Sequence, residues 1–321
     1  MVCNTAQSTC STRTSVSTSQ TTSIVYAAAT EEQEAKCFAT LNIAVGKAVV
    51  LRLVPPYAKE LVPKITLPSY PKPITDLYDP AALLLTYPDL LTECKRVYAL
   101  YKVTKEQSAY LEAHTREQSC SKLWFAHRAG RITASNFKSA VVTNSCMPSL
   151  SLISRLCYPE NHKFSTTATR WGCKHEQDAK TAYCDIMKES HPGFTFKDSG
   201  LFIDTDNPFL GASPDGIAQC DCCEERVVEI KCPYCFKEGL PDEDSTNFCM
   251  VNKEGKWSLK QNHAYFYQVQ LQLHVCNLNY ADFVLWTKQD TIVERLDKNS
   301  AFIREKLRLL NISLQMGAFQ R

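Results

Sequence analysis

The alternation of hydrophobic and polar positions predicts an α/β fold for the second part of the chain. Short runs of β-branched and aromatic residues bounded by turn residues are typical of strands, and they span residues 200–204, 226–232, 281–287 and 291–296. Stretches with apolar residues at helical spacing predict helices over residues 172–187, 262–276 and 299–314. Residues 124–142 have the pattern of helix, turn, helix, with Thr133 or Ser135 as the cap of the second helix.

The first 120 residues are organised differently. Residues 1–35 are rich in Ser and Thr and poor in large apolar residues, so we expect a flexible tail that cannot repay the entropy of ordering. Prolines recur through residues 37–80 and favour short extended pieces and turns over long helices. Helices are predicted over residues 87–101 and, from a capping-box pattern, over residues 104–118. We therefore expect a tail (1–35), an N-terminal region of unassigned role (36–120) and a domain that carries the chemistry (121–321).

Composition narrows the class of protein. The chain has 321 residues, of which 44% are hydrophobic, which is ample for a buried core. No apolar run reaches the roughly 20 residues of a membrane span, and no secretory signal is recognisable, so we expect an intracellular protein, with the nucleus as a candidate compartment. The net charge of +2 requires any nucleic-acid partner to be held by a local patch, and residues 101–138, with seven basic and three acidic side chains, provide a candidate.

The most specific chemical signal is Ser213-Pro214-Asp215-Gly216 followed by Glu229-Ile230-Lys231. In a strand, Glu229 and Lys231 point to one face and Ile230 to the other. If the preceding segment returns Asp215 beside Glu229, two carboxylates converge and supply the oxygen ligands that Mg²⁺ prefers. Such a metal polarises a phosphodiester oxygen and lowers the pKa of bound water, while Lys231 orients or deprotonates that water or neutralises charge.

Each of these patterns has a simpler interpretation when taken alone. The first tetrapeptide is a good turn signal, and a Glu-x-Lys pair in a strand is usually solvated. The residues around the second pattern are Val227, Val228, Ile230 and Cys232, which predict a strand that is apolar on both faces and therefore buried. Charges in a buried strand require a partner or a function.

Four blocks of sequence in a fixed order resemble the YqaJ-like viral recombinases, relatives of phage lambda exonuclease in the PD-(D/E)XK nuclease superfamily. The resemblance spans about residues 123–296. Its blocks are Arg128-Ala129-Gly130-Arg131-Ile132-Thr133-Ala134-Ser135, then Gly172-Cys173-Lys174-His175-Glu176, then Asp215 with Glu229 and Lys231, and finally Tyr265-Phe266-Tyr267-Gln268-Val269-Gln270-Leu271-Gln272. It implies a restriction-endonuclease-like α/β core with a mixed central sheet flanked by helices.

The resemblance also implies roles for individual residues. Arg128 and Ser135 are expected to bind a DNA phosphate at a 5′ end, because a guanidinium and a hydroxyl at a helix start suit an anion. Gln268 is expected to hold the attacking water or the phosphate. The remaining expected DNA contacts are Arg131, Tyr265 and Lys260, and the expected metal ligands are Glu176, Asp215, Glu229 and the backbone carbonyl of Ile230.

The resemblance points to a Mg²⁺-dependent 5′→3′ exonuclease on double-stranded DNA, with Mn²⁺ as a substitute ion. A single-strand-annealing recombination partner and a homo-oligomer are implied only by the family. Three alternatives stay open. They are an endonuclease or nickase with the same site, a non-catalytic DNA-binding module, and a zinc-binding interaction protein.

A cysteine cluster flanks the predicted catalytic strand. It comprises Cys220, Cys222, Cys223, Cys232 and Cys235. Such a group could bind a structural Zn²⁺ or an iron–sulfur cluster, but its spacing fits neither a zinc ribbon nor a ferredoxin. Buried free thiols are the favoured interpretation of these five residues.

Overall fold

The computed structural model describes residues 28–45, 48–54, 57, 69–144, 147–162, 166–241 and 247–315. The chain divides into two compact units, residues 1–67 and 68–321. In the first unit, helix α1 (Glu31–Ala44) is followed by the short 3₁₀ helix η1 (Val49–Leu53). The expectation of a tail through residue 35 and of extended pieces after it is wrong for α1, which a capping box opens before any proline occurs. The rest of the expected tail, residues 1–27, lies outside the described residues.

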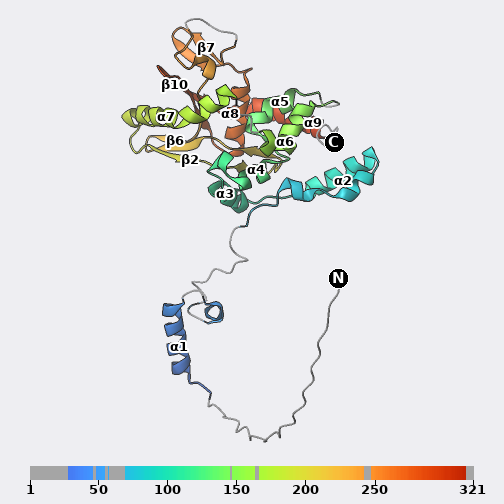
Figure 1. Ribbon diagram of the computed structural model, residues 1–321, viewed down its shortest axis with the longest axis vertical. Coiled ribbons are helices and arrows are strands. Elements are labelled where there is room, and N and C mark those ends of the chain that lie inside the picture. Colours follow the sequence, from blue (N-terminus) through green and yellow to red (C-terminus); the bar gives the residue numbers. More distant parts are fainter. Residues whose placement is uncertain are drawn as a thin grey trace, which may run out of the picture. The chain divides into compact units, whose positions relative to one another are not determined.

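A mixed five-stranded sheet forms the centre of the second unit (Figure 1). Its order is β10-β9-β6-β5-β2, where β6 and β9 are parallel and the other neighbours are antiparallel. The strands are β2 (Thr195–Asp198), β5 (Gly216–Cys220), β6 (Cys223–Lys231), β9 (Tyr280–Trp286) and β10 (Thr291–Asp297). The mixed sheet with its helices confirms the expected α/β fold class. The three longest strands follow the sequence pattern, whereas β2 and β5, which are short and partly polar, carry too weak a signal to be predicted.

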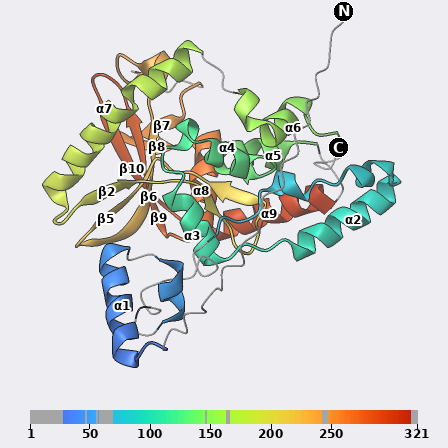
Figure 2. The same ribbon diagram turned by 60° about the horizontal axis from the view of Figure 1, so that its bottom comes forward.

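Helices cover both faces of this sheet, which buries β6 on both sides (Figure 2). On one face, α7 (Thr167–Ser190) packs Ala179 and Tyr183 against Val228 and Ile230. On the other face, α8 (Ala264–Val275) packs its apolar residues around Val227 and the side chains of β9. The strand with the acid and the base is therefore buried, as its apolar flanks predict.

The second unit also contains a three-stranded sheet of order β1-β4-β3. It consists of β1 (Ile132–Thr133), β4 (Leu210–Ala212) and β3 (Phe202–Ile203). The predicted helix, turn, helix is present as α4 (Lys122–Arg128) and α5 (Phe137–Val142), with β1 and the turn η7 (Ala134–Asn136) between them. Gly130, between α4 and β1, lets the chain turn there because its φ is +76°. A Cβ at this position would come within 2.8 Å of the Ile74 side chain.

The remaining described elements frame these two sheets. Helices α6 (Leu150–Cys157) and α9 (Ser300–Gln315) contribute to the core around α5 and α8. Strands β7 (Met250–Lys253) and β8 (Lys256–Leu259) form a hairpin. The others are η4 (Ile74–Leu77), η5 (Pro80–Leu84), α2 (Tyr87–Leu100), α3 (Lys105–Ala113), η6 (Gln118–Cys120), η8 (Pro159–His162) and η9 (Tyr234–Phe236).

Helix α3 docks on the backbone around β3. The Ser108 hydroxyl donates to the Ile203 carbonyl at 2.9 Å, and the Glu112 carboxylate accepts from the Gly200 amide at 3.0 Å. The helix ends at Ala113, earlier than predicted, because the Thr115 hydroxyl bonds to the Leu111 carbonyl at 2.7 Å and accepts the Leu201 amide at 2.8 Å. The backbones approach so closely at Gly200 that a Cβ would lie 2.0 Å from the Glu112 carbonyl oxygen.

We expect Gly200→Ala to lower the free energy of unfolding by more than about 2 kcal/mol, because the backbone of α3 must move away from the added methyl group. Gly172→Ala is the matched control, since a Cβ at this helical position meets no atom within 4 Å. That variant is expected to be about 0.5–1 kcal/mol more stable than the wild type. Urea denaturation of the three proteins measures both effects, and equal stabilities would contradict the close contact.

Candidate active site

Strand β6 presents Glu229 and Lys231 on the face covered by α8. Glu229 is only 1% exposed. Its carboxylate accepts hydrogen bonds from three donors, which are the Lys231 amine and the Gln268 amide at Oε1 and the Gln272 amide at Oε2, the last at 2.6 Å. Both glutamines come from α8, one helical turn apart. The structure thus brings together the predicted acid, base and glutamine.

Asp215 lies at the turn that leads from β4 into β5, where it meets β6. Its carboxylate accepts the Ile230 amide at 2.6 Å, and its own amide donates to the Val228 carbonyl at 3.1 Å. Burial raises the pKa of Asp215 to about 8, with the negative charges of Glu229 and, more weakly, Glu176 acting in the same direction. The two predicted carboxylates therefore lie close enough to repel each other.

The positive charge of Lys231 partly offsets this repulsion. Burial lowers the pKa of the Lys231 amine, but the carboxylates of Glu229 and Asp215 outweigh burial and raise the pKa overall. Lys231 is therefore an ammonium group in the metal-free protein. The ring centroid of Tyr265 lies 5.0 Å from its nitrogen, which places this predicted DNA contact beside the site.

Three side chains from distant segments hold the turn that carries Asp215. The Pro214 carbonyl accepts from the Ser199 hydroxyl at 2.7 Å and from the Gln118 amide at 2.8 Å. The Ser213 hydroxyl accepts the Trp124 indole N–H at 2.9 Å. The tetrapeptide Ser213-Pro214-Asp215-Gly216 therefore forms a turn, as its sequence indicates, and this turn positions the buried carboxylate of Asp215. These supporting residues are absent from the sequence-based site, because no local pattern connects them to it.

Glu176 lies on α7, across the sheet from the glutamines of α8. Its carboxylate pairs with Lys180 at 2.9 Å, and Lys180 also reaches Asp198 at 2.8 Å. Glu176 is near enough to Asp215 to raise the pKa of that group, and its side chain is 44% exposed. It borders the carboxylate pair, and its ion pair with Lys180 holds it on the surface of α7.

Arg128 and Ser135, the predicted phosphate contacts, lie together at the turn around β1. The Arg128 guanidinium stacks on Trp124, 3.9 Å from the ring centroid. One of its nitrogens donates to Thr133 at 3.2 Å and to Ser135 at 3.4 Å, whereas its buried Nε has no hydrogen-bond partner. Burial lowers the pKa of Arg128 to about 10, which leaves it charged at neutral pH. A fixed, charged guanidinium beside an exposed hydroxyl suits a phosphate.

The expectation that Arg131 binds DNA is wrong. Its side chain is completely buried, and its guanidinium donates to the carbonyls of Pro208 and His127 and to the Tyr101 hydroxyl. These contacts leave it no access to a phosphate. The number of basic side chains over residues 101–138 therefore overstates the positive charge available to bind DNA. Arg116 also does not add to it, because it is paired with Glu112 at 2.8 Å.

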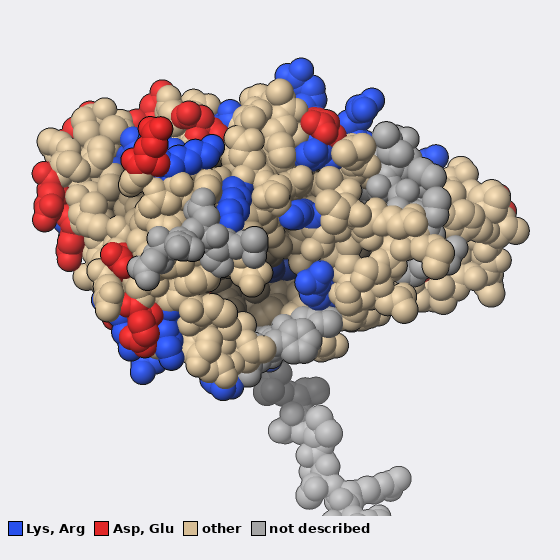
Figure 3. Space-filling model, turned by 90° about the horizontal axis from the view of Figure 1, so that it is seen from above, with Lys and Arg blue, Asp and Glu red and all other residues tan. Residues whose placement is uncertain are grey.

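A separate cationic group surrounds the start of α8. The pKa of His263 is lowered by burial and then by the positive charges of Lys138 and Lys260, which therefore lie near it. Lys138 donates to the Asn262 carbonyl, which fixes it at this position. Figure 3 shows one face of the molecule on which Lys and Arg gather around a hollow, while Asp and Glu lie mainly toward one end. Lys260 lies with Lys138 near the start of α8.

The donor set around Asp215 fits a hard divalent cation. Two carboxylates converge with the backbone of Ile230 between them, and their mutual repulsion is the cost that a bound cation relieves. All of these groups offer oxygen atoms, which Mg²⁺ and Mn²⁺ prefer over the nitrogen and sulfur ligands typical of Zn²⁺. Asp215 and Glu229, with Glu176 at the border and the Ile230 carbonyl, are the residues that could hold it.

The predicted group of five cysteines is wrong. Cys220, Cys222 and Cys223 gather at the hairpin that joins β5 to β6. Cys232 and Cys235 follow the opposite end of β6, where the Cys232 thiol donates to the His175 carbonyl at 3.7 Å. The nine residues of β6 span about 30 Å, so one metal cannot bind at both ends.

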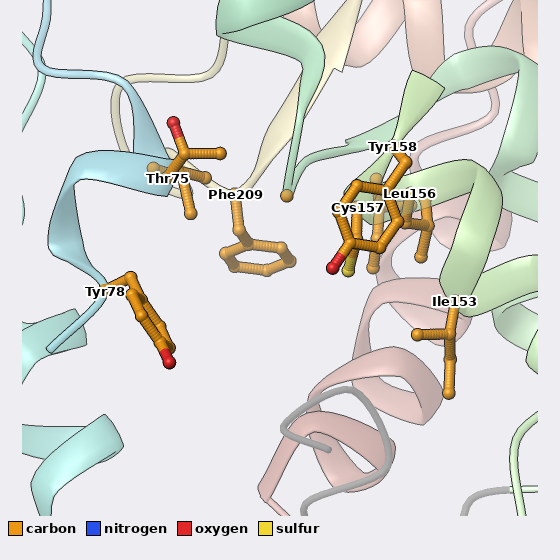
Figure 4. Close-up of a pocket in the computed structure, with 10 residues that line it drawn as sticks. Thr75, Tyr78, Ile153, Leu156, Cys157, Tyr158 and Phe209 are labelled. Carbon is orange, nitrogen blue, oxygen red and sulfur yellow. The ribbon is translucent and has the colours of Figure 1, made fainter. Parts of the chain in front are cut away.

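An apolar cavity of about 650 Å³ is lined by residues of η4, β1 and α6 (Figure 4). It is lined mainly by aromatic and aliphatic side chains, including Tyr78, Ile153, Tyr158 and Phe209. The described residues that line it include no carboxylate and no amine.

Residues 123–279 match the model of the YqaJ-like viral recombinase domain. This part of the chain is similar to the domain that this family model describes. The matched YqaJ-like domain includes Arg128, Ser135, Glu176, the carboxylate pair and Gln268. No curated protein sequence matches the chain. In the described residues, we find no helix of the length and apolarity that a membrane span requires.

Several solved structures are similar to the chain. An alkaline exonuclease from Laribacter hongkongensis is 22% identical, over 62% of this chain and 93% of that one, with a TM-score of 0.44. The shutoff and exonuclease protein of Kaposi's sarcoma-associated herpesvirus is 15% identical, over 67% and 73%, with a TM-score of 0.44. A phage-related exonuclease from Haemophilus somnus is 12% identical, over 59% and 94%, with a TM-score of 0.39.

In the YqaJ-like domain, Asp215→Asn is expected to stabilise the metal-free protein. The raised pKa means that the folded state holds a proton that the unfolded chain releases near pH 4. Wild-type stability should therefore fall as the pH rises from about 4 to 8, and the Asn variant should lack this component. Denaturation in chelator across this range measures the difference. Asp206→Asn, at an exposed carboxylate, is the control, and a stability gain of equal size there would contradict the explanation.

Proposed function

We propose that the chain is a metal-dependent deoxyribonuclease that hydrolyses double-stranded DNA from 5′ ends. The observation that carries this proposal is the convergence of Asp215 and Glu229 beside Lys231 within the YqaJ-like domain. Two buried carboxylates that repel each other lower the free energy of unfolding, so stability does not explain their presence. A binding module would have no use for them, because they repel phosphate unless a cation lies between.

Bound Mg²⁺ would polarise the scissile phosphate and lower the pKa of an attacking water. The chain's own residues prepare this site. Gln268 and Gln272 fix the Glu229 carboxylate by hydrogen bonds from α8, and the Ile230 amide fixes Asp215. Because these hydrogen bonds already hold both carboxylates in place, the carboxylates need not reorganise when substrate binds. Lys231, as an ammonium group, is placed to neutralise negative charge that develops on the phosphate during hydrolysis.

The preference for 5′ ends is proposed from the group of Arg128 and Ser135. This group is mechanically connected to the carboxylates, because Trp124 supports the Arg128 guanidinium with its ring and bonds to Ser213 through its indole N–H. Ser213 is two residues before Asp215. A terminal phosphate held by Arg128 would therefore be positioned relative to the site of cleavage. Lys138 and Lys260, the two lysines near His263, offer further contacts to the DNA backbone.

Lys231→Ala is expected to reduce hydrolysis of linear double-stranded DNA by at least about 100-fold in the presence of Mg²⁺, because developing charge loses its neutralising partner. Chelator should abolish the wild-type activity. The control is Lys188→Ala, at an exposed position of α7, which should leave the rate unchanged. Closed circular DNA should remain intact in every reaction. Cutting of the circle would replace the exonuclease with the endonuclease, and intact linear DNA despite binding would favour the binding module.

Arg128→Ala and Ser135→Ala are expected to remove the preference for 5′-phosphorylated over 5′-hydroxyl ends. The Arg variant should lose about 1–3 kcal/mol of discrimination, since a charge-assisted contact to the terminal phosphate disappears. Rates on the two substrates, compared at equal DNA concentrations, measure this loss. Lys188→Ala should retain the wild-type ratio. An unchanged ratio in both site variants would exclude this group as the pocket for the terminal phosphate.

A further inference from the structure

A compact group of three thiols and an imidazole lies at the opposite end of β6 from the carboxylates. It comprises Cys220, Cys222 and Cys223 of the β5–β6 hairpin and His191 at the C-terminal cap of α7. Their ligand atoms all lie within 4.8 Å of one another. The His191 Nδ1 atom is 3.2, 3.6 and 3.7 Å from the sulfurs of Cys222, Cys223 and Cys220 respectively.

We propose that these four residues bind one structural Zn²⁺ ion. With Zn–S of about 2.3 Å and Zn–N of about 2.0 Å, tetrahedral ligands are about 3.5 to 3.8 Å apart. The sulfurs of Cys220 and Cys222 lie 3.6 Å apart, and those of Cys222 and Cys223 lie 3.8 Å apart. A multi-iron cluster would hold its ligands further apart, so the spacing fits a single ion. Three thiolates and a histidine form one of the standard closed sets for structural zinc.

Charge around the group supports an anionic centre. Arg226 and Asp282 are completely buried and paired at 2.7 Å, and Arg295 pairs with the same carboxylate at 2.9 Å. Two arginines facing one aspartate leave a surplus of one positive charge. Three thiolates with Zn²⁺ and a neutral imidazole carry one negative charge, which balances it.

Both arginines also point toward the sulfurs. Arg226 donates to the Cys220 sulfur at 3.4 Å, and Arg295 donates to the Cys223 sulfur at 3.7 Å. Donors of this kind commonly surround metal-bound thiolates and orient them.

The backbone brings the two segments together without the ion. The Asp221 amide donates to the Pro192 carbonyl at 3.0 Å. Gly193 permits this approach, since its φ is +67° and a Cβ there would collide with the Asp221 carboxylate at 2.3 Å. A preformed site of this kind lowers the entropic cost of binding. The ion would tie the end of α7 to the sheet, and it would fix the helix that carries Glu176.

Metal analysis of the full-length protein, purified without chelator, tests the proposal. We expect one zinc per chain in the wild type and in Cys235→Ser, whose thiol is exposed and lies beyond the other end of β6. Asp215→Asn should also retain one zinc, which separates this site from the catalytic carboxylates and from the fate of the nuclease proposal. Cys222→Ser and His191→Gln should each lose at least about 80% of the zinc. Cobalt substituted for zinc should show thiolate charge-transfer bands and tetrahedral ligand-field bands.

A second measurement on the wild type covers the case in which those variants do not fold. Alkylation followed by peptide mapping should find Cys220, Cys222 and Cys223 protected until a strong chelator is added, whereas Cys120 and Cys235 react at once. Chelator should also lower the melting temperature. Zinc-free wild-type protein that takes up no cobalt, full zinc retention in folded Cys222→Ser, stoichiometric iron, or a disulfide among the three cysteines would each overturn the proposal.

Discussion

The burial of a charged glutamate inside the protein is the constraint on which the site depends. A carboxylate that is 1% exposed requires partners, and Glu229 finds them in a lysine two residues along its own strand and in two amides of α8. Those amides fix the rotation of α8, and Val269 and Leu273 of the same helix lie in the core cluster with the side chains of β9. The packing of α8 on this face of the sheet and the geometry of the site therefore depend on the same contacts.

The second carboxylate depends on segments that the site itself does not include. Asp215 is held through its turn by Ser199, Gln118 and Trp124, and only Trp124 of these lies within the α4 helix that also supports Arg128. Gln118 follows α3, which docks on the backbone at Gly200. Residues before position 121 thus contribute to holding the turn that carries Asp215.

The sequence alone predicted that Glu229 and Lys231 share one face, because side chains alternate along a strand. Gln268 was expected from the resemblance to the YqaJ-like recombinases, and the structure brings its amide to the Glu229 carboxylate. It placed Arg131 wrongly, since spacing cannot tell which of two nearby arginines is buried under a neighbouring segment. His191 could not be found, because strands β2, β3, β4 and most of β5 separate it in sequence from Cys220. Cys232 and Cys235 are close to the other three cysteines in sequence, but the extended strand β6 separates the two groups in space.

Strand β6 also restricts how this chain can change during evolution. One end of the strand carries Cys223 and the other carries Glu229 and Lys231, and helices cover both of its faces. Deleting a single residue between these ends would turn Glu229 toward α7 and Ile230 toward the glutamines of α8. Two residues would have to be lost together to restore the alternation, and the parallel pairing with β9 would then be two positions short. Descendants of this chain must therefore keep the length of β6.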